Sequence, residues 1–126
     1  ILTYRILFLI MINIYKIISI IYIIILTFAL LIPLDLYIVT SIVKKDAHPS
    51  NNFSFLIHLF LFYILYLLFS LSFNNKYKIL FFCIIYAITA ELFQLFSSRG
   101  FQFLDIIFNL LGVLISFAVL KYFLKI

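Results

Sequence analysis

The feature that most constrains this chain is an apolar run over residues 17–34, IISIIYIIILTFALLIPL, which contains no charged side chain. A helix of about 20 such residues spans the hydrocarbon core of a bilayer. Of the 126 residues, 68% are apolar and 10% are charged, and the mean hydropathy is +1.36. A chain this short cannot build a core that would bury so much apolar surface. The composition therefore excludes a soluble globular enzyme and a disordered chain, and it predicts an integral membrane protein.

Four apolar segments, separated by short polar stretches, are long enough to cross a bilayer. We place them at residues 17–34, 55–73, 79–96 and 103–120. Residues 6–15 are also apolar, and they form either an interfacial helix or an extension of the first span into one long tilted helix. The sequence thus predicts an all-α fold, a polytopic bundle of four transmembrane helices in a single domain over residues 1–126.

Basic residues predict the orientation of the bundle, because Lys and Arg favour the cytoplasmic side. Four spans put both chain ends on one side, which carries Arg5, Lys16, Lys76, Lys78, Lys121 and Lys125. The opposite side carries Lys44, Lys45 and Arg99. We therefore expect both termini in the cytoplasm. The net charge of +5 forms no stripe that could follow a phosphate backbone, so membrane lipid is the expected partner and nucleic acid is not.

Polar side chains inside the spans are the candidate functional residues, since an ionisable group there costs about 2.5–3.5 kcal/mol on insertion scales. They come from three spans and from the turn between the last two: His58, Glu91, Gln94, Arg99, Asp105 and Asn109. The predicted topology places all six at the outer end of the bundle. We therefore expect them to converge in one polar cluster.

The charges of this set balance locally. Arg99 lies between Glu91 and Asp105 in the sequence and can pair with either carboxylate, and His58 can form a hydrogen bond with either acid. Such a set can bind a polar ligand, carry out general acid–base chemistry, or hold helices together as a structural ion-pair network. The sequence leaves these three alternatives open.

Two further patterns concern packing and metals. Gly112 and Ser116, four residues apart, predict a helix face of small residues that packs against a neighbour. Only His58, Glu91 and Asp105 could supply zinc ligands at this depth, and no helix carries an HExxH motif. No glycine-rich phosphate loop is present either. We therefore predict neither a metal nor a cofactor.

The stretch over residues 91–112, ELFQLFSSRGFQFLDIIFNLLG, resembles the VanZ-like family of small bacterial membrane proteins. The family signature is similar to E-x-x-Q, then R, then D-x-x-x-N-x-x-G. His58 and Phe62 resemble the family's H-x-x-x-aromatic pattern, and the resemblance extends over about residues 16–120. It implies a place in the bacterial cytoplasmic (inner) membrane and a role in the cell envelope. The family is named for a protein linked to resistance to the glycopeptide antibiotic teicoplanin.

Three hypotheses about function follow. The leading one is a protein that binds a polar or anionic envelope component, a membrane lipid or a lipid-linked precursor, at the outer leaflet, with a link to glycopeptide resistance. In it, Arg99 contacts the anionic group while Glu91 and Asp105 orient Arg99. The second is an intramembrane enzyme on a lipid-linked substrate, with Glu91 or His58 as general base. The third is a structural accessory subunit whose cluster only locks its helices. Assembly into a homo- or hetero-oligomer in the membrane is open under each hypothesis.

Overall fold

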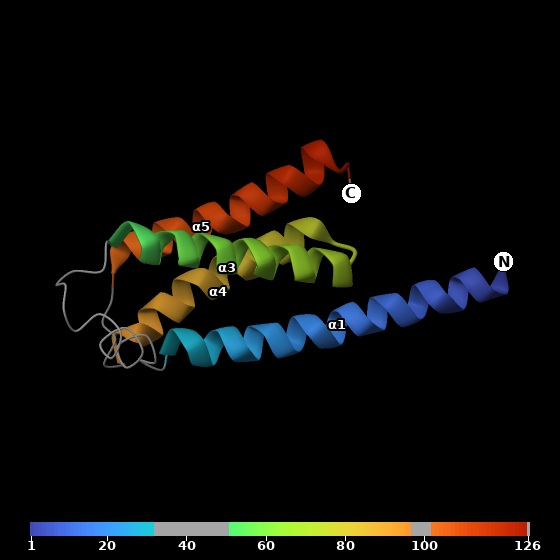
Figure 1. The fold of residues 1–126 in the computed structure, drawn as a ribbon, viewed down its shortest axis with the longest axis horizontal. Helices are drawn as coiled ribbons and strands as arrows, with labels where there is room; N and C mark the ends of the chain where they lie inside the picture. The colour runs from blue at the N-terminus through green and yellow to red at the C-terminus, as the bar shows by residue number, and fades with distance from the viewer. Residues whose placement is uncertain (32–50, 97–101, 126) are drawn as a thin grey trace.

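The structure is a computed structural model in which residues 1–31, 51–96 and 102–125 are described, and within these ranges it is helical without a strand (Figure 1). The helices are α1 (Leu2–Leu31), α3 (Asn51–Ser72), α4 (Lys76–Gln94) and α5 (Phe103–Ala118), and α5 continues into the π-helical turn η1 (Val119–Phe123). Within these described ranges, four helices are long and apolar enough to cross a membrane. The predicted all-α bundle of four membrane helices is therefore confirmed.

The first helix, α1, is continuous from Leu2 to Leu31. Residues 6–15 are thus its N-terminal part and do not form a separate interfacial helix. No glycine or proline interrupts this stretch, so nothing in the sequence breaks the helix. Its 30 residues extend over about 45 Å at 1.5 Å per residue, which exceeds a bilayer core of roughly 30 Å. Figure 1 shows its N-terminal end extending beyond the other helices. The predicted end of this span, residues 32–34, lies outside the described residues.

Successive helices run in opposite directions, so each end of the bundle is formed by the starts of some helices and the last turns of the others. Asn75 caps α4 by accepting a hydrogen bond from the backbone N–H of Lys78 at 3.2 Å, and this cap closes the short turn after α3. Both chain termini and this turn lie at one end, which we call the termini end (Figure 1). The last turns of α1 and α4 and the first turns of α3 and α5 lie at the other, which we call the cluster end.

Burial in the bundle is reversed relative to a soluble domain. Large apolar side chains such as Phe60 and Phe81 point outward with 60% and 67% of their surface exposed. Several polar side chains, among them Ser19, Glu91 and Asn109, are fully buried. This pattern suits a lipid surround, in which polar groups must find their partners inside the protein.

The contact between α3 and α5 is the most extensive between any two of the described helices, and Gly112 makes it possible. A Cβ atom at Gly112 would collide with the carbonyl oxygen of Leu59 and would lie 3.1 Å from the backbone nitrogen of Tyr63. Ser116, one turn further along α5, is fully buried. The small residues of α5 thus lie on the buried side of this helix, and Gly112 lets the two backbones approach closely.

Polar contacts attach α1 to the rest of the bundle. The Ser19 and Ser72 hydroxyls lie 2.7 Å apart, and the Tyr22 hydroxyl donates to the Leu61 carbonyl at 2.7 Å. The Thr27 hydroxyl lies 2.8 Å from that of Tyr86. These side chains were not among the predicted functional residues, although their spacing on one face of α1 could have indicated a helix contact.

Candidate functional site

Four buried polar side chains from three helices lie together at the cluster end: His58 of α3, Glu91 of α4, and Asp105 and Asn109 of α5. We call these four the polar cluster. Glu91 and Asn109 are fully buried, His58 is 3% exposed and Asp105 is 7% exposed. The alternating direction of the helices sets their common depth, and the four-residue spacing of Asp105 and Asn109 puts both on one face of α5.

Asn109 joins α3 to α4 through its two amide atoms. Its Nδ2 donates to Glu91 Oε1 at 3.2 Å, and its Oδ1 lies 3.0 Å from His58 Nδ1. An amide oxygen can only accept a hydrogen bond, so His58 Nδ1 must carry a proton. The bridging amide therefore holds the imidazole with Nδ1–H toward Asn109, and Nε2 faces Asp105.

The imidazole of His58 lies between two carboxylates. Nδ1 is 3.8 Å from Glu91 Oε1, and Nε2 is 3.7 Å from Asp105 Oδ2. The Nε2 side of the ring therefore faces the carboxylate of Asp105. In the neutral ring with Nδ1–H, Nε2 is an acceptor, as is the Asp105 carboxylate, so one donor group can bridge the two.

Asp105 contributes a carboxylate oxygen to the polar cluster that forms no hydrogen bond in the described part of the chain. Its Oδ1 is buried and has no hydrogen-bond partner among residues 1–31, 51–96 and 102–125. A buried acceptor without a partner costs about 1–3 kcal/mol. Asp105 Oδ1 is therefore the atom of the cluster best suited to accept a hydrogen bond from an added donor group.

Two other predicted site residues lie differently. Gln94 is 1% exposed, and its Nε2 donates to the Leu30 carbonyl at 3.1 Å, so it links α4 to the last turn of α1. Carbonyls in a last helical turn accept hydrogen bonds from outside their own helix. Arg99 lies outside the described residues, and its pairing with Glu91 and Asp105 stays a prediction.

Three members of the polar cluster could hold a metal ion. His58, Glu91 and Asp105 each offer one ligand atom, and these atoms lie within 4.8 Å of one another. Bonds to Zn²⁺ of about 2.0–2.2 Å would place tetrahedral ligand atoms roughly 3.4 Å apart. The three side chains would therefore have to move closer together to coordinate an ion. One feature does favour a metal: the Nδ1–H of His58 is held by the amide oxygen of Asn109, and metal-binding histidines commonly hold their second ring nitrogen in this way.

Comparisons with protein-family models, with curated proteins and with solved structures found no match to this chain. The fold and the site define its class directly: a four-helix membrane protein with a buried histidine–carboxylate cluster at one end. The resemblance to the VanZ-like family stays a prediction that rests on the sequence motif.

Proposed function

We propose that this chain is a multi-pass protein of the bacterial cytoplasmic membrane, related to VanZ-like proteins, that binds the polar headgroup of an envelope lipid or lipid-linked precursor at the outer leaflet. One observation carries the proposal. A histidine and two carboxylates are gathered, almost fully buried, in a bundle whose outer surface is apolar.

Energetics favour a binding role over a purely structural one. A hydrogen bond between membrane helices contributes about 0.6 kcal/mol on average, whereas inserting a charged side chain costs about 2.5–3.5 kcal/mol. Hydroxyl groups already link α1 to α3 and α4 without charge. Glu91 and Asp105, with carboxylate oxygens within 4.8 Å of each other, are therefore a costly way to join helices.

The proposed roles follow the positions of the atoms. His58 Nε2 and Asp105 receive a hydroxyl or amine of the ligand, because Nε2 lies 3.7 Å from Asp105 Oδ2 and Asp105 Oδ1 has no hydrogen-bond partner in the described part of the chain. Asn109 and Glu91 hold the imidazole in place. Arg99, five residues after Gln94 in the sequence, contacts the anionic part of the ligand.

Mass spectrometry of lipids that co-purify with the protein tests this function. We expect the unsubstituted protein to retain a specific envelope lipid, and Glu91→Gln and Arg99→Ala to lose most of it. Thr27→Val is the matched control, because it removes a polar contact of α1 that lies outside the cluster. Equal lipid retention by all four proteins would contradict the proposal.

An enzymatic role is the second candidate, favoured by the fixed tautomer of His58. With Nδ1–H held by Asn109, Nε2 is available as a general base or acid beside Asp105. Incubation of the purified protein with lipid-linked envelope precursors separates the two roles. Recovery of the lipid with unchanged mass supports binding alone, and conversion that depends on His58 supports catalysis.

The outer-leaflet placement predicts a labelling pattern in cells. In a Cys83→Ala background, an impermeant thiol reagent added from outside should label Ser98→Cys and should not label Asn74→Cys. Asn74 is exposed in the α3–α4 turn, and it is preferred to Asn75 because Asn75 caps α4. The reverse labelling pattern would place the polar cluster at the cytoplasmic leaflet.

A further inference from the structure

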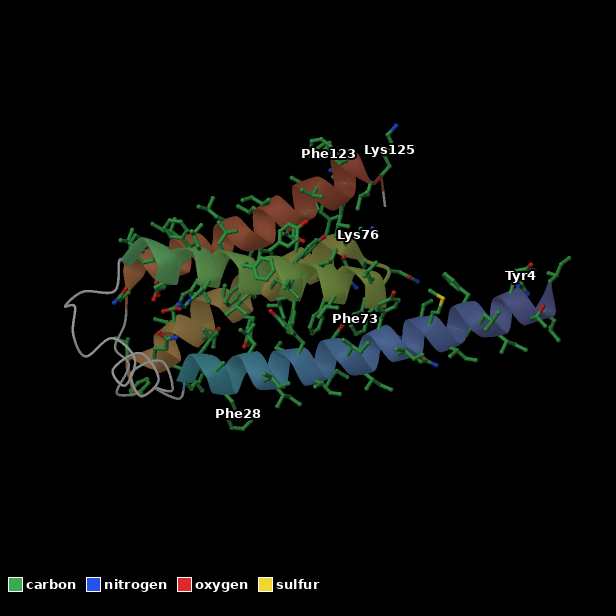
Figure 2. All side chains as sticks on the ribbon, viewed as in Figure 1. Tyr4, Phe28, Phe73, Lys76, Phe123 and Lys125 are labelled. Atoms are coloured by element: carbon green, nitrogen blue, oxygen red, sulfur yellow. The ribbon has the colours of Figure 1, made fainter. Side chains whose placement is uncertain are left out.

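A second polar site lies at the termini end of the bundle, away from the polar cluster. It is a hollow of about 510 Å³ lined by Asn74, Asn75, Lys76, Tyr77, Phe117 and Lys121. The α3–α4 turn and the start of α4 form one wall, and the C-terminal part of α5 with η1 forms the other. Figure 2 shows Lys76 at the end of the bundle that carries both termini. We call this hollow the lysine hollow.

The lysine hollow holds two ammonium groups. Lys76 Nζ is covered by protein atoms and has no hydrogen-bond partner in the described part of the chain. Lys121 Nζ donates to the Tyr77 hydroxyl at 2.9 Å and lies 5.3 Å and 5.4 Å from the ring centres of Tyr77 and Phe117. Lys76 is also the first residue of α4, where the backbone N–H groups carry partial positive charge.

No acidic residue belongs to the lining of this hollow. The four acidic residues of the sequence are Asp35, Asp46, Glu91 and Asp105, and the last two lie in the polar cluster at the opposite end. A covered ammonium that forms no hydrogen bond is unfavourable. An anion with several acceptor oxygens would supply hydrogen bonds to Lys76 and countercharge to both lysines.

We propose that the lysine hollow binds the phosphate of an anionic membrane phospholipid, in the leaflet opposite the polar cluster. The hollow lies at the end of transmembrane helices, and Tyr77 and Phe117 provide the aromatic wall that is common at headgroup depth. Lys16, whose Nζ is 5.7 Å from the ring centre of Phe73, is a further cation at this end. This site is independent of the function proposed for the polar cluster.

The test compares lipid binding by native mass spectrometry in detergent, with phosphatidylglycerol against phosphatidylcholine. We expect the unsubstituted protein to prefer phosphatidylglycerol. Lys76→Gln and Lys121→Gln should each weaken its binding about fivefold, and the double variant about 30-fold, because one lysine near anionic lipid contributes that much. Lys125→Gln is the matched control: it removes the same charge from the same end, and Lys125 does not line the hollow.

Two further variants separate lipid binding from local packing. Tyr77→Phe removes the hydrogen bond from Lys121 and leaves the positive charge of Lys121 in place, so lipid binding should persist. Lys76→Arg keeps the positive charge at position 76, so lipid binding should persist in this variant as well. If the double variant does not fold, the two single lysine variants are still compared with Lys125→Gln in their binding of phosphatidylglycerol. Equal binding of both lipids, or an equal loss in Lys125→Gln, would overturn the proposal. Full competition by free glycerol 3-phosphate at the same concentration would also overturn it, and would assign the hollow to a soluble phosphate compound.

Discussion

Replacing the four residues of the polar cluster by leucine, together with Arg99→Met, should give a protein that folds and inserts but has lost its function. A buried charged network that is exchanged as a whole for well-packed apolar side chains is often neutral or stabilising. The unfolding temperature in detergent should therefore equal or exceed that of the unsubstituted protein. The helical circular dichroism signal and the complementation of a deletion strain under envelope stress measure the two properties separately.

A single substitution within the same cluster should have the opposite effect on stability. Asn109→Leu removes the amide that connects Glu91 to His58, so each of these buried groups loses a hydrogen bond. Because each loss costs about 1–3 kcal/mol, we expect a destabilisation of about 3 kcal/mol and a clearly lower unfolding temperature. The contrast between the single and the complete replacement is the diagnostic result.

Complementation then decides between the hypotheses. A complete replacement that folds and fully complements the deletion strain would contradict both the binding and the enzymatic roles, and would leave the structural one. Folding with loss of complementation is the result that the proposed function requires.

The helices were predictable from the sequence because a bilayer allows few alternatives to a helix for a long apolar run. The ends of α3, α4 and α5 differ from the predicted spans by only a few residues. The status of residues 6–15 was not predictable, since a ten-residue, mainly apolar segment fits an interfacial helix as well as a helix extension. The continuous α1 follows from the absence of a helix breaker, since its residues 2–11 are all exposed.

The depth of the candidate site was also predictable, because topology alone puts the start of α3, the end of α4 and the start of α5 together. The pairing of individual atoms was not. Asn109 was interpreted as one of several polar side chains, but its position makes it the bridge between Glu91 and His58. Gln94, on the same helix as Glu91, instead contacts Leu30 of α1. Such choices depend on the rotation and spacing of helices, which hydropathy does not encode.

The lysine hollow illustrates the same limit. Lys76 and Lys121 entered the sequence analysis only as charges that orient the bundle. They are 45 positions apart in the sequence, and they line one hollow because α4 and the end of α5 meet at the termini end. No spacing rule within one helix could have revealed this pairing.

Gly112→Ala should destabilise the protein by about 1–3 kcal/mol, the usual cost of overpacking. The added methyl group meets the backbone of Leu59 and Tyr63 rather than a flexible side chain, so α3 and α5 must separate. Ser116→Ala is the matched control on the same face of α5. Its buried hydroxyl has no hydrogen-bond partner among the described residues, so its removal should leave the unfolding temperature unchanged or raise it.

Gly112→Ala should also impair the polar cluster, although Gly112 is not part of it. His58 directly precedes Leu59 on α3, and Asn109 lies three residues before Gly112 on α5. A separation of the helices at Gly112 therefore lengthens the 3.0 Å contact between His58 Nδ1 and Asn109 Oδ1, which releases the orientation of the imidazole. We expect Gly112→Ala to lose both stability and the co-purifying lipid, while Ser116→Ala keeps both. If Gly112→Ala matched the unsubstituted protein in both measurements, the close approach of α3 and α5 would not be what positions His58.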